Sequence, residues 1–377
     1  MNSSLSESEL QRYSRHLLLP EFGLAGQERV KGAHVAVIGA GGLGSPLILY
    51  LAAAGIGKIT VVDFDLVERS NLQRQIIYID ENVGQPKAAQ AAARAMELNP
   101  DVQVHYLNCR LDVQNAFSIL SPCDVVVDGS DNFATRYLVN DACVLLNKPN
   151  VHGAIYRFEG QASVFSFADG PCYRCLFPEP PSEDSVPNCA EAGVLGVMAG
   201  VIGCIQATET IKLISGIGTP LKGKLLLYDA LSMRFDTLPI KKNPDCPICG
   251  SNPVIKTLEE SLISCRGKDN EMDAKIISAT ELQNELKAGK QLLLLDVRTN
   301  EEVALSKLPN SKHIPLPELP MRTAEIDNKA DIVVYCKSGG RSMRAMQFLN
   351  EHGFDKVRNL TGGITAWAQD VDRDVRV

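Results

Sequence analysis

The stretch from residue 34 to residue 62 restricts the possible fold more than any other part of the sequence. It reads as an apolar strand over His34–Ile38, a glycine-rich turn over Gly39–Gly44, an uncharged helix over Ser45–Ala54 and a second apolar strand over Lys58–Val62. A strand, a tight turn, a helix and a further strand in this order form the unit from which doubly wound α/β sheets are built.

The alternation of strand and helix patterns continues through the next 170 residues. The further predicted elements are a helix at Pro86–Leu98, strands at Val102–Leu107 and Asp124–Asp128, a helix at Asn132–Leu146, and strands at Gln161–Phe167 and Lys224–Asp229. Such alternation indicates a mostly parallel sheet covered by helices. The predicted fold class is therefore α/β, with a Rossmann-like doubly wound sheet.

The pattern changes after Cys249, where a charged stretch without periodicity begins. We predict a first domain over residues 1–250, a linker over 251–275 and a smaller α/β domain over 276–377, since linkers are polar and domains of about 100 residues are common. The elements predicted for the smaller domain are a helix at Ala279–Ala288, strands at Leu292–Val297 and Ile332–Tyr335, and a helix at Ser342–His352.

The composition disfavours some partners and compartments. The formal net charge is −7, whereas nucleic-acid backbones bind basic surfaces, so we expect no nucleic-acid partner. The first nine residues have neither a basic region nor an apolar core, which disfavours a secretory signal. Eleven cysteines without such a signal indicate a reducing compartment, and we expect a cytoplasmic protein.

Two uncharged runs have to be weighed as membrane segments. Gly32–Gly57 contains Pro46 and the glycine turn, so it is better read as a buried strand, turn and helix. Ala192–Thr208 is short for a membrane span and contains four glycines, which favours a buried helix packed closely on its neighbours. We therefore predict no membrane segment.

The glycine turn has the spacing of a phosphate-binding loop. Gly39, Gly41 and Gly44 would let the backbone approach a phosphate at a helix N-terminus, and Asp63, at the end of the next strand, would accept hydrogen bonds from ribose hydroxyls. An NAD-dependent oxidoreductase would have the same pattern. Arg74 and Lys87 could bind a triphosphate, and Asp131 could hold Mg²⁺, which favours an adenylating enzyme.

The motifs Ser70–Gln75, Gly84–Lys87 and Asp128–Asn132, together with Arg12–His16, resemble those of the enzymes that activate ubiquitin-like proteins with ATP. The nearest groups are the molybdopterin-synthase and thiamine-biosynthesis adenylyltransferases, and the resemblance covers about residues 5–250. It implies the following residues at the ATP site: Gly42, Asp63, Asp65, Asn71, Arg74, Lys87, Asp131 and Asn132.

The same resemblance implies a substrate and a homodimer. The substrate would be the C-terminal carboxylate of a small ubiquitin-like sulfur-carrier protein ending in Gly-Gly. Its attack on the α-phosphate gives an acyl-adenylate and pyrophosphate. Arg15 would reach into the ATP site of the partner subunit.

Four cysteines stand in two Cys-x-x-Cys pairs, Cys172 with Cys175 and Cys246 with Cys249. Two such pairs can supply the four thiolates of a closed, structural Zn²⁺ site. Two redox dithiols or disulfides are the alternatives. Intracellular cysteine pairs bind metal more often than they form disulfides, so we predict zinc.

Cys336 follows an apolar strand, precedes a helix and lies four intervening residues before Arg341. Backbone N–H groups of such a loop favour an anion, and the helix N-terminus and Arg341 would stabilise a thiolate or persulfide. With Leu295–Arg298, Lys312–Pro315 and Leu360–Ile364, this loop resembles the rhodanese family over about residues 276–370. The resemblance implies a persulfide on Cys336. A phosphatase, which has a longer loop, and a non-catalytic binding module are the alternatives.

The other cysteines carry less information. By resemblance to related activating enzymes, Cys189 could form a thioester or disulfide-linked intermediate, or help to cleave an acyl-persulfide. Cys109, Cys123, Cys143 and Cys204 have no motif around them, and we expect them in the core.

The resulting hypothesis is a bifunctional enzyme that adenylates a sulfur carrier and then converts its C-terminus to a thiocarboxylate. Tethering the sulfur domain raises the effective concentration of persulfide near the adenylate. The donor would be thiosulfate or a cysteine desulfurase. Molybdenum-cofactor synthesis is the expected pathway, with thiamine or cysteine biosynthesis and tRNA thiolation as alternatives. A non-catalytic scaffold for ubiquitin-like proteins and an NAD-linked oxidoreductase are the competing interpretations.

Overall fold

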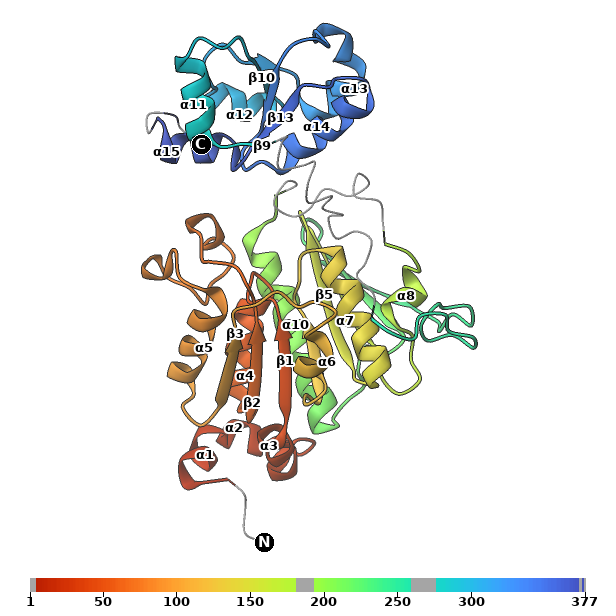
Figure 1. Cartoon of the computed structure of the whole chain (residues 1–377). Helices are drawn as coiled ribbons and strands as arrows, with labels where there is room; N and C mark the ends of the chain where they lie inside the picture. Colours follow the sequence, from red (N-terminus) through yellow and green to blue (C-terminus); the bar gives the residue numbers. More distant parts are fainter. Residues whose placement is uncertain (1–4, 181–192, 259–275, 373–374, 376–377) are drawn as a thin grey trace. The chain divides into compact units, whose positions relative to one another are not determined.

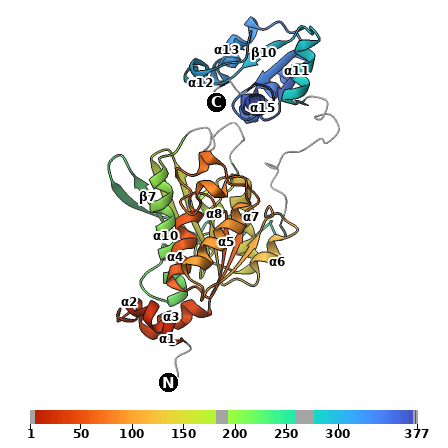
Figure 2. The ribbon, with the colours of Figure 1, turned by 90° about the vertical axis from the view of Figure 1, so that its left-hand side faces the viewer.

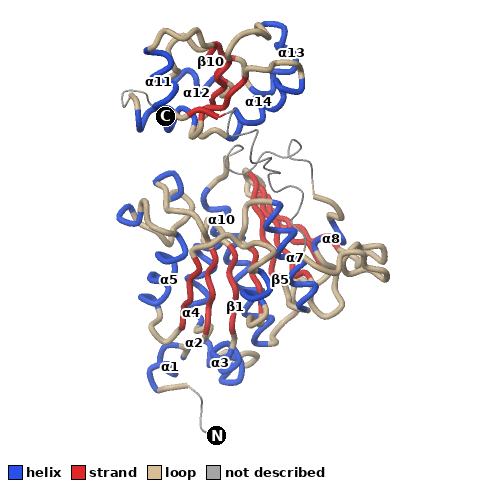
Figure 3. Tube along the Cα trace, in the orientation of Figure 1, coloured by secondary structure: helices blue, strands red, loops and turns tan. Residues whose placement is uncertain are grey.

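The structure is a computed structural model and describes residues 5–180, 193–258, 276–372 and 375. The chain divides into two compact units, one up to residue 265 and one from residue 266. Each unit contains one sheet with helices around it (Figures 1 and 3).

The first unit is built on an eight-stranded sheet with the order β3-β2-β1-β4-β5-β6-β7-β8. Its strands are β1 His34–Ile38, β2 Lys58–Val62, β3 Gln103–Leu107, β4 Val125–Asp128, β5 Asn150–Tyr156, β6 Glu159–Phe165, β7 Lys224–Asp229 and β8 Arg234–Pro239. The pairs from β3 to β5 are parallel, and the pairs from β5 to β8 are antiparallel.

Helices cover both faces of the parallel part of this sheet (Figure 2). The helices are α1 Glu7–Arg12, α2 Ser14–Leu17, α3 Gly23–Gly32, α4 Gly44–Ala54, α5 Lys87–Leu98, α6 Ala116–Leu120, α7 Phe133–Leu146, α8 Tyr173–Leu176 and α10 Gly196–Ser215, with 3₁₀ turns η1 Arg69–Asn71 and η2 Asp80–Asn82. Along β1, Val35 and Val37 enter the core with α4 and α5, while Ala36 and Ile38 enter the core with α6 and α7. An apolar strand without polar alternation is what a doubly covered parallel sheet requires.

The predicted strands and helices of the first unit are confirmed, and their ends differ from the predicted ones by no more than two residues. The exception is α10, which begins and ends later than the uncharged run. The sequence analysis missed β5 and β8; it predicted β6 and β7 as strands but not the antiparallel pairing of β5 to β8. Among the described helices, only α10 is long and apolar enough to cross a membrane by length and composition. It packs on α4 and β5, as the buried-helix prediction requires.

The second unit has a five-stranded parallel sheet with the order β11-β10-β12-β13-β9. Its strands are β9 Ile276–Ile277, β10 Leu293–Asp296, β11 Lys312–His313, β12 Ile332–Tyr335 and β13 Val357–Leu360. Its helices are α11 Ala279–Lys287, α12 Asn300–Leu305, α13 Leu319–Arg322, α14 Gly340–Glu351 and α15 Gly363–Asp370, with 3₁₀ turns η4 Leu316–Glu318 and η5 Thr323–Glu325. One face packs on α13 and α14, the other on α11 and α15.

Much of the predicted linker, residues 259–275, lies outside the described residues. Residues 251–258 are described, and Ile255 packs against the cluster that contains Cys172 and Cys246. The domain boundaries themselves stay a prediction.

Candidate functional site

The glycine turn between β1 and α4 is closed so tightly that side chains are excluded from it. Gly39 has a φ of +92°, and a Cβ there would lie 2.9 Å from the carbonyl oxygen of Gly129. A Cβ on Gly44 would lie 2.1 Å from the carbonyl oxygen of Gly39. Glycine is therefore required at both positions, and the backbone of the turn stays open to an approaching ligand.

Asp63 at the end of β2 holds this turn in place. One carboxylate oxygen accepts a hydrogen bond from the backbone N–H of Ala40 at 2.8 Å, and the other accepts one from Asp65 at 2.9 Å. Burial raises the pKa of Asp63, although these two N–H donors act in the opposite direction. A carboxylate has lone pairs beyond these two bonds, so Asp63 can still accept hydrogen bonds from a ligand.

A pocket opens at the carboxyl ends of β1, β2 and β4, where the glycine turn, the residues after β2 and the residues after β4 meet. This is the edge at which open α/β sheets bind ligands. The predicted site residues among those that line the pocket are Gly42, Asp63, Asp65, Arg74, Lys87, Asp131 and Asn132. Asn71 is not in the lining; it is buried, and its side chain accepts a hydrogen bond from the N–H of Glu68.

The charged residues of the pocket differ in how firmly they are held. Lys87 is buried, and its ammonium group lies 2.9 Å from the carboxylate of Asp65. Arg74 donates a hydrogen bond to the carbonyl oxygen of Ser70 at 3.2 Å. Asp131 is exposed, whereas the side chain of Asn132 caps α7 by accepting from the N–H of Thr135. Two cations and an accessible carboxylate thus face one cavity.

Asp128, to which the sequence analysis gave no role, fixes the loop that carries Asp131. It is fully buried and accepts hydrogen bonds from the N–H of Ser130 at 3.0 Å and its hydroxyl at 2.6 Å. His152 lies beside it, with Nδ1 3.4 Å from the carboxylate. Burial works to raise the pKa of Asp128, but the hydrogen bonds with His152 and Ser130 and the positive charge of Arg136 outweigh it and lower the pKa. Burial lowers the pKa of His152, which fits a neutral imidazole beside an ionised carboxylate.

Arg15 lies far from the pocket of its own chain. It is exposed on α2, which contacts α3, and α3 leads into the amino end of β1 (Figure 1). The pocket is at the opposite, carboxyl end of the same strand. A role for Arg15 at an ATP site therefore requires a second copy of the chain.

The four predicted metal ligands come together. The Sγ atoms of Cys172 and Cys246 are 3.5 Å apart, and those of Cys175 and Cys249 are 3.3 Å apart. All four sulfur atoms lie within 4.8 Å of one another. These separations are too long for disulfides and close to the edge of about 3.8 Å of a tetrahedron with Zn–S bonds of about 2.3 Å. The donor set fits Zn²⁺.

Cys336 sits at the end of β12 with its sulfur turned into the loop before α14. Its Sγ accepts a hydrogen bond from the N–H of Gly339 at 3.2 Å, and the hydroxyl of Ser342 lies 3.4 Å away. A Cβ on Gly363 would lie 2.4 Å from the carbonyl oxygen of Cys336, so glycine is needed there. The predicted loop with an inward N–H donor is confirmed at Gly339.

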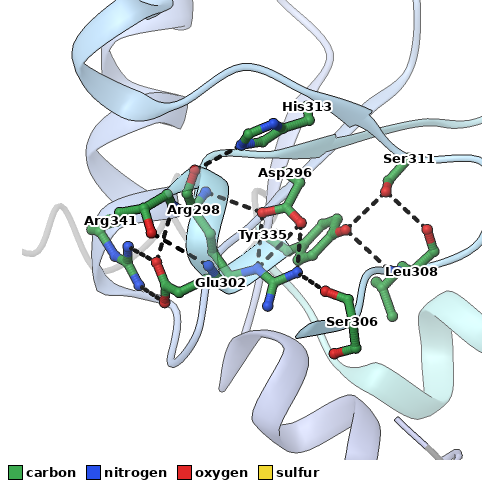
Figure 4. A network of polar contacts seen from close by, with 10 residues as sticks. Asp296, Arg298, Glu302, Ser306, Leu308, Ser311, His313, Tyr335 and Arg341 are labelled. Carbon is green, nitrogen blue, oxygen red and sulfur yellow. Dashed lines mark hydrogen bonds and ion pairs between the residues drawn. The ribbon is translucent and has the colours of Figure 1, made fainter. Parts of the chain in front are cut away.

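Arg341 follows this loop, and its guanidinium group is engaged by Glu302 (Figure 4). The two nitrogens of Arg341 donate to the two carboxylate oxygens of Glu302 at 2.6 and 2.7 Å. Sequence analysis missed Glu302, because its contact with Arg341 depends on the pairing of β10 with β12.

The remaining cysteines divide into two groups. Cys123 and Cys143 are buried as predicted. Cys109 packs against the core beside α6 and α7 but is only partly buried and also lines the pocket, and Cys204 is likewise only partly buried, so neither is fully in the core. Cys189 lies outside the described residues.

Comparison with known proteins gives two family matches, the ThiF family over residues 13–248 and the rhodanese-like domain over residues 278–370. The probable adenylyltransferase/sulfurtransferase MoeZ of Mycobacterium tuberculosis is 45% identical over 99% of this chain and 96% of its own length. The adenylyltransferase and sulfurtransferase MOCS3 of Arabidopsis thaliana is 40% identical over 99% of this chain and 86% of its own length. The sulfur carrier protein adenylyltransferase of Thermus thermophilus is 53% identical over 69% of this chain and 98% of its own length.

Among solved structures, E. coli MccB with ATP has a TM-score of 0.58 at 22% identity, over 66% of this chain and 77% of that one, which shows a shared fold. The resemblances to activating enzymes and rhodaneses are confirmed, and the NAD-linked oxidoreductase is disfavoured. The chain belongs to the ThiF family and carries a rhodanese-like domain, so it is an enzyme that joins an adenylyltransferase to a sulfurtransferase.

Proposed function

We propose that this enzyme uses ATP to adenylate the C-terminal glycine of a ubiquitin-like sulfur-carrier protein, and that Cys336 then supplies the sulfur of a thiocarboxylate. The observation that carries this proposal is one pocket that unites residues of five separate segments, namely the glycine turn and the segments that carry Asp63, Arg74, Lys87 and Asp131. Names of relatives that mention a sulfur carrier support the choice of substrate.

In the adenylation step, the glycine turn and the N-terminus of α4 receive phosphate oxygens, and Asp63 accepts from the ribose. Arg74 and Lys87 stabilise the charge that develops on the triphosphate, and Asp131 would hold Mg²⁺, which would neutralise further phosphate charge. Asp65 orients Lys87 through the ion pair between them. The carrier carboxylate attacks the α-phosphorus, the bond to the bridging oxygen breaks, and pyrophosphate leaves.

In the sulfur step, the Cys336 thiolate attacks the outer sulfur of a donor such as thiosulfate, which leaves as sulfite, and a persulfide remains. The terminal sulfur of that persulfide attacks the acyl-adenylate carbonyl, expels AMP and forms an acyl disulfide. A second thiolate then attacks the Cys336 sulfur, releases the thiocarboxylate and forms a disulfide with Cys336. Cys189 is our candidate for that thiolate, and a cellular thiol reductant then restores both cysteines.

Zn²⁺ held by Cys172, Cys175, Cys246 and Cys249 would have a structural role. The four sulfurs form a closed set without a position for a reacting water, and the pairs are more than seventy residues apart in sequence. The metal would tie the segment around α8 to the end of the first unit.

We further propose an assembly and a cellular role. The enzyme would be a cytoplasmic homodimer in which Arg15 completes the ATP site of the partner subunit. The domains would span residues 1–250 and 276–377, joined by the linker 251–275. Molybdenum-cofactor synthesis is the pathway we propose, and a cysteine desulfurase is the alternative donor to thiosulfate.

The test is incubation of the full chain with candidate carriers ending in Gly-Gly, ATP, Mg²⁺ and thiosulfate, followed by intact mass of the carrier. We expect the exchange of one oxygen for one sulfur at its C-terminus. A Cys336→Ala variant should release pyrophosphate but give no thiocarboxylate. Absence of pyrophosphate release with every Gly-Gly carrier would overturn the adenylation half of the proposal.

A further inference from the structure

The guanidinium group of Arg341, which directly follows the sulfur loop, is held by the carboxylate of Glu302 on helix α12. Arg341 and Glu302 form a bidentate pair at 2.6 and 2.7 Å, and both side chains are largely shielded from water, with exposed fractions of 19% and 26%. Arg341 is next in sequence to Ser342, whose hydroxyl lies 3.4 Å from Sγ of Cys336. The pair therefore involves the residue that directly follows the sulfur loop and lies in the first turn of α14.

Glu302 is itself fixed, so this pair is more than a chance surface contact. It is the third residue of α12 and closes a capping box, in which its carboxylate accepts from the N–H of Thr299 at 3.0 Å and its own N–H donates to the Thr299 hydroxyl. A carboxylate with three donors has little freedom to move away from Arg341.

A buried ion pair anchors both ends of α12 (Figure 4). Arg298 is nearly completely buried and donates to the carboxylate of Asp296 at the end of β10. The same guanidinium donates to the carbonyl oxygen of Ser306, which follows α12, at 2.7 Å. His313 donates to the carbonyl oxygen of Arg298 at 2.8 Å. The helix that carries Glu302 is thus tied to β10, the neighbour of β12, and Cys336 directly follows β12.

We infer that Glu302 is a positioning residue that sets which sulfur donors Cys336 accepts, by holding and neutralising Arg341. This inference rests on the proposed persulfide chemistry. Without the negative charge of Glu302 beside it, the guanidinium of Arg341 would attract dianionic donors more strongly, because the interaction grows with the product of the charges. Paired with Glu302, Arg341 attracts anionic donors less strongly. The difference in kcat/KM between highly charged donors and donors of lower charge, such as a persulfide, is therefore smaller.

The test uses two donors that transfer the same sulfur atom and differ in charge. Thiosulfate is a dianion that leaves as sulfite, and benzenethiosulfonate is a monoanion that leaves as benzenesulfinate. Loading of Cys336 in the full chain is followed by intact mass, and kcat and KM are measured for each donor. In Glu302→Gln we expect kcat/KM for thiosulfate to rise about fivefold, mainly through KM, and that for the monoanion by about twofold.

The matched control is Glu285→Gln. Glu285 forms a bidentate pair with Arg358 at 2.9 and 2.8 Å in the same unit, and it lies on α11, which packs on the face of the sheet opposite α14. Its removal should leave the ratio of the two kcat/KM values unchanged. A purely structural role of Glu302 would lower kcat for both donors to the same extent.

A second comparison tests whether the effect of Glu302 depends on Arg341. In an Arg341→Ala background, Glu302→Gln should no longer reduce the KM for thiosulfate relative to the monoanion, because the cation on which the effect depends is absent. An unchanged donor ratio in Glu302→Gln, or the same shift with and without Arg341, overturns the inference. If the wild-type chain takes no sulfur on Cys336 from either donor, the proposed sulfur step fails as well, so the two failures are distinguishable.

Discussion

The carboxylate of Asp63 accepts the backbone N–H of Ala40 at 2.8 Å, and this bond joins the end of β2 to the glycine turn that follows β1. The turn therefore does not hold its shape by glycine alone. A residue that would bind the ribose also supports the loop that would bind phosphate, so a substitution at Asp63 affects both.

Asp63→Ala removes the acceptor of two backbone N–H groups, those of Ala40 and Asp65. We expect the free energy of unfolding to fall by about 1–3 kcal/mol, since partly buried donors lose their partner. We also expect the rise in Tm caused by ATP to shrink, because ligand stabilisation depends on affinity. Urea denaturation measures the first effect, and differential scanning fluorimetry with and without ATP measures the second. An undiminished ATP shift would contradict the ribose role of Asp63.

Asp131→Ala should remove activity without affecting stability. Asp131 is exposed at the pocket, and Asp128 holds its loop independently through Ser130. We expect carrier-dependent ATP–pyrophosphate exchange to fall about 100-fold or more, as when a group that stabilises charge in a transition state is lost. Asp80→Ala is the control, since Asp80 is exposed and is not among the residues that line the pocket. Normal exchange in Asp131→Ala would refute the Mg²⁺ role.

Cys249→Ser should lower both metal content and stability. Its sulfur lies 3.3 Å from that of Cys175, so loss of one thiolate opens the four-sulfur set. We expect less than one bound zinc per chain and a loss on the order of 3 kcal/mol in the free energy of unfolding, because structural zinc contributes directly to folding. Elemental analysis and denaturation with and without chelator provide the measurements. Cys204→Ser, outside the cluster, should behave like the wild type, and a metal-free wild type would remove the zinc assignment.

Local patterns predicted the parallel half of the first sheet well, for a physical reason. Its central strands β1, β2 and β4 are buried on both faces and read as continuous apolar runs, as in Val35–Ile38 and Val125–Val127. β5 was missed because it contains Asn150, His152 and Gly153, which are poor strand signals. Gly153 is required by packing, since a Cβ there would lie 2.5 Å from the side chain of Gln206 on α10. Such a reason appears only in three dimensions.

Those parts of the site could be predicted in which the residue type and its spacing carry the chemistry. Contacts that depend on how neighbouring strands pair could not be predicted. The glycine turn, the four cysteines and Cys336 have recognisable spacing. By contrast, Asp128 contacts His152 because β4 and β5 pair in parallel at these residues. Neither the spacing nor the residue types indicate this contact. The contact of Glu302 with Arg341 spans 39 positions and likewise depends on the sheet.

The pair of Glu302 with Arg341 also predicts how the second unit responds to acid. The hydrogen bond from Arg341 lowers the pKa of Glu302 from 4.5 to about 2, with burial acting in the opposite direction. Because the folded-state pKa is the lower one, the stabilisation is fully present above pH 4.5 and is lost as the pH falls towards 2. We expect Glu302→Gln to cost about 1 kcal/mol at neutral pH after solvent screening, and the difference from wild type to shrink across that window. Urea denaturation followed by Trp367 fluorescence at several pH values gives the measurement, since Trp367 is the single tryptophan of the chain and lies in the core of this unit. A difference between the two proteins that stays constant from pH 7 to about pH 2 would show that the ion pair contributes nothing to folding.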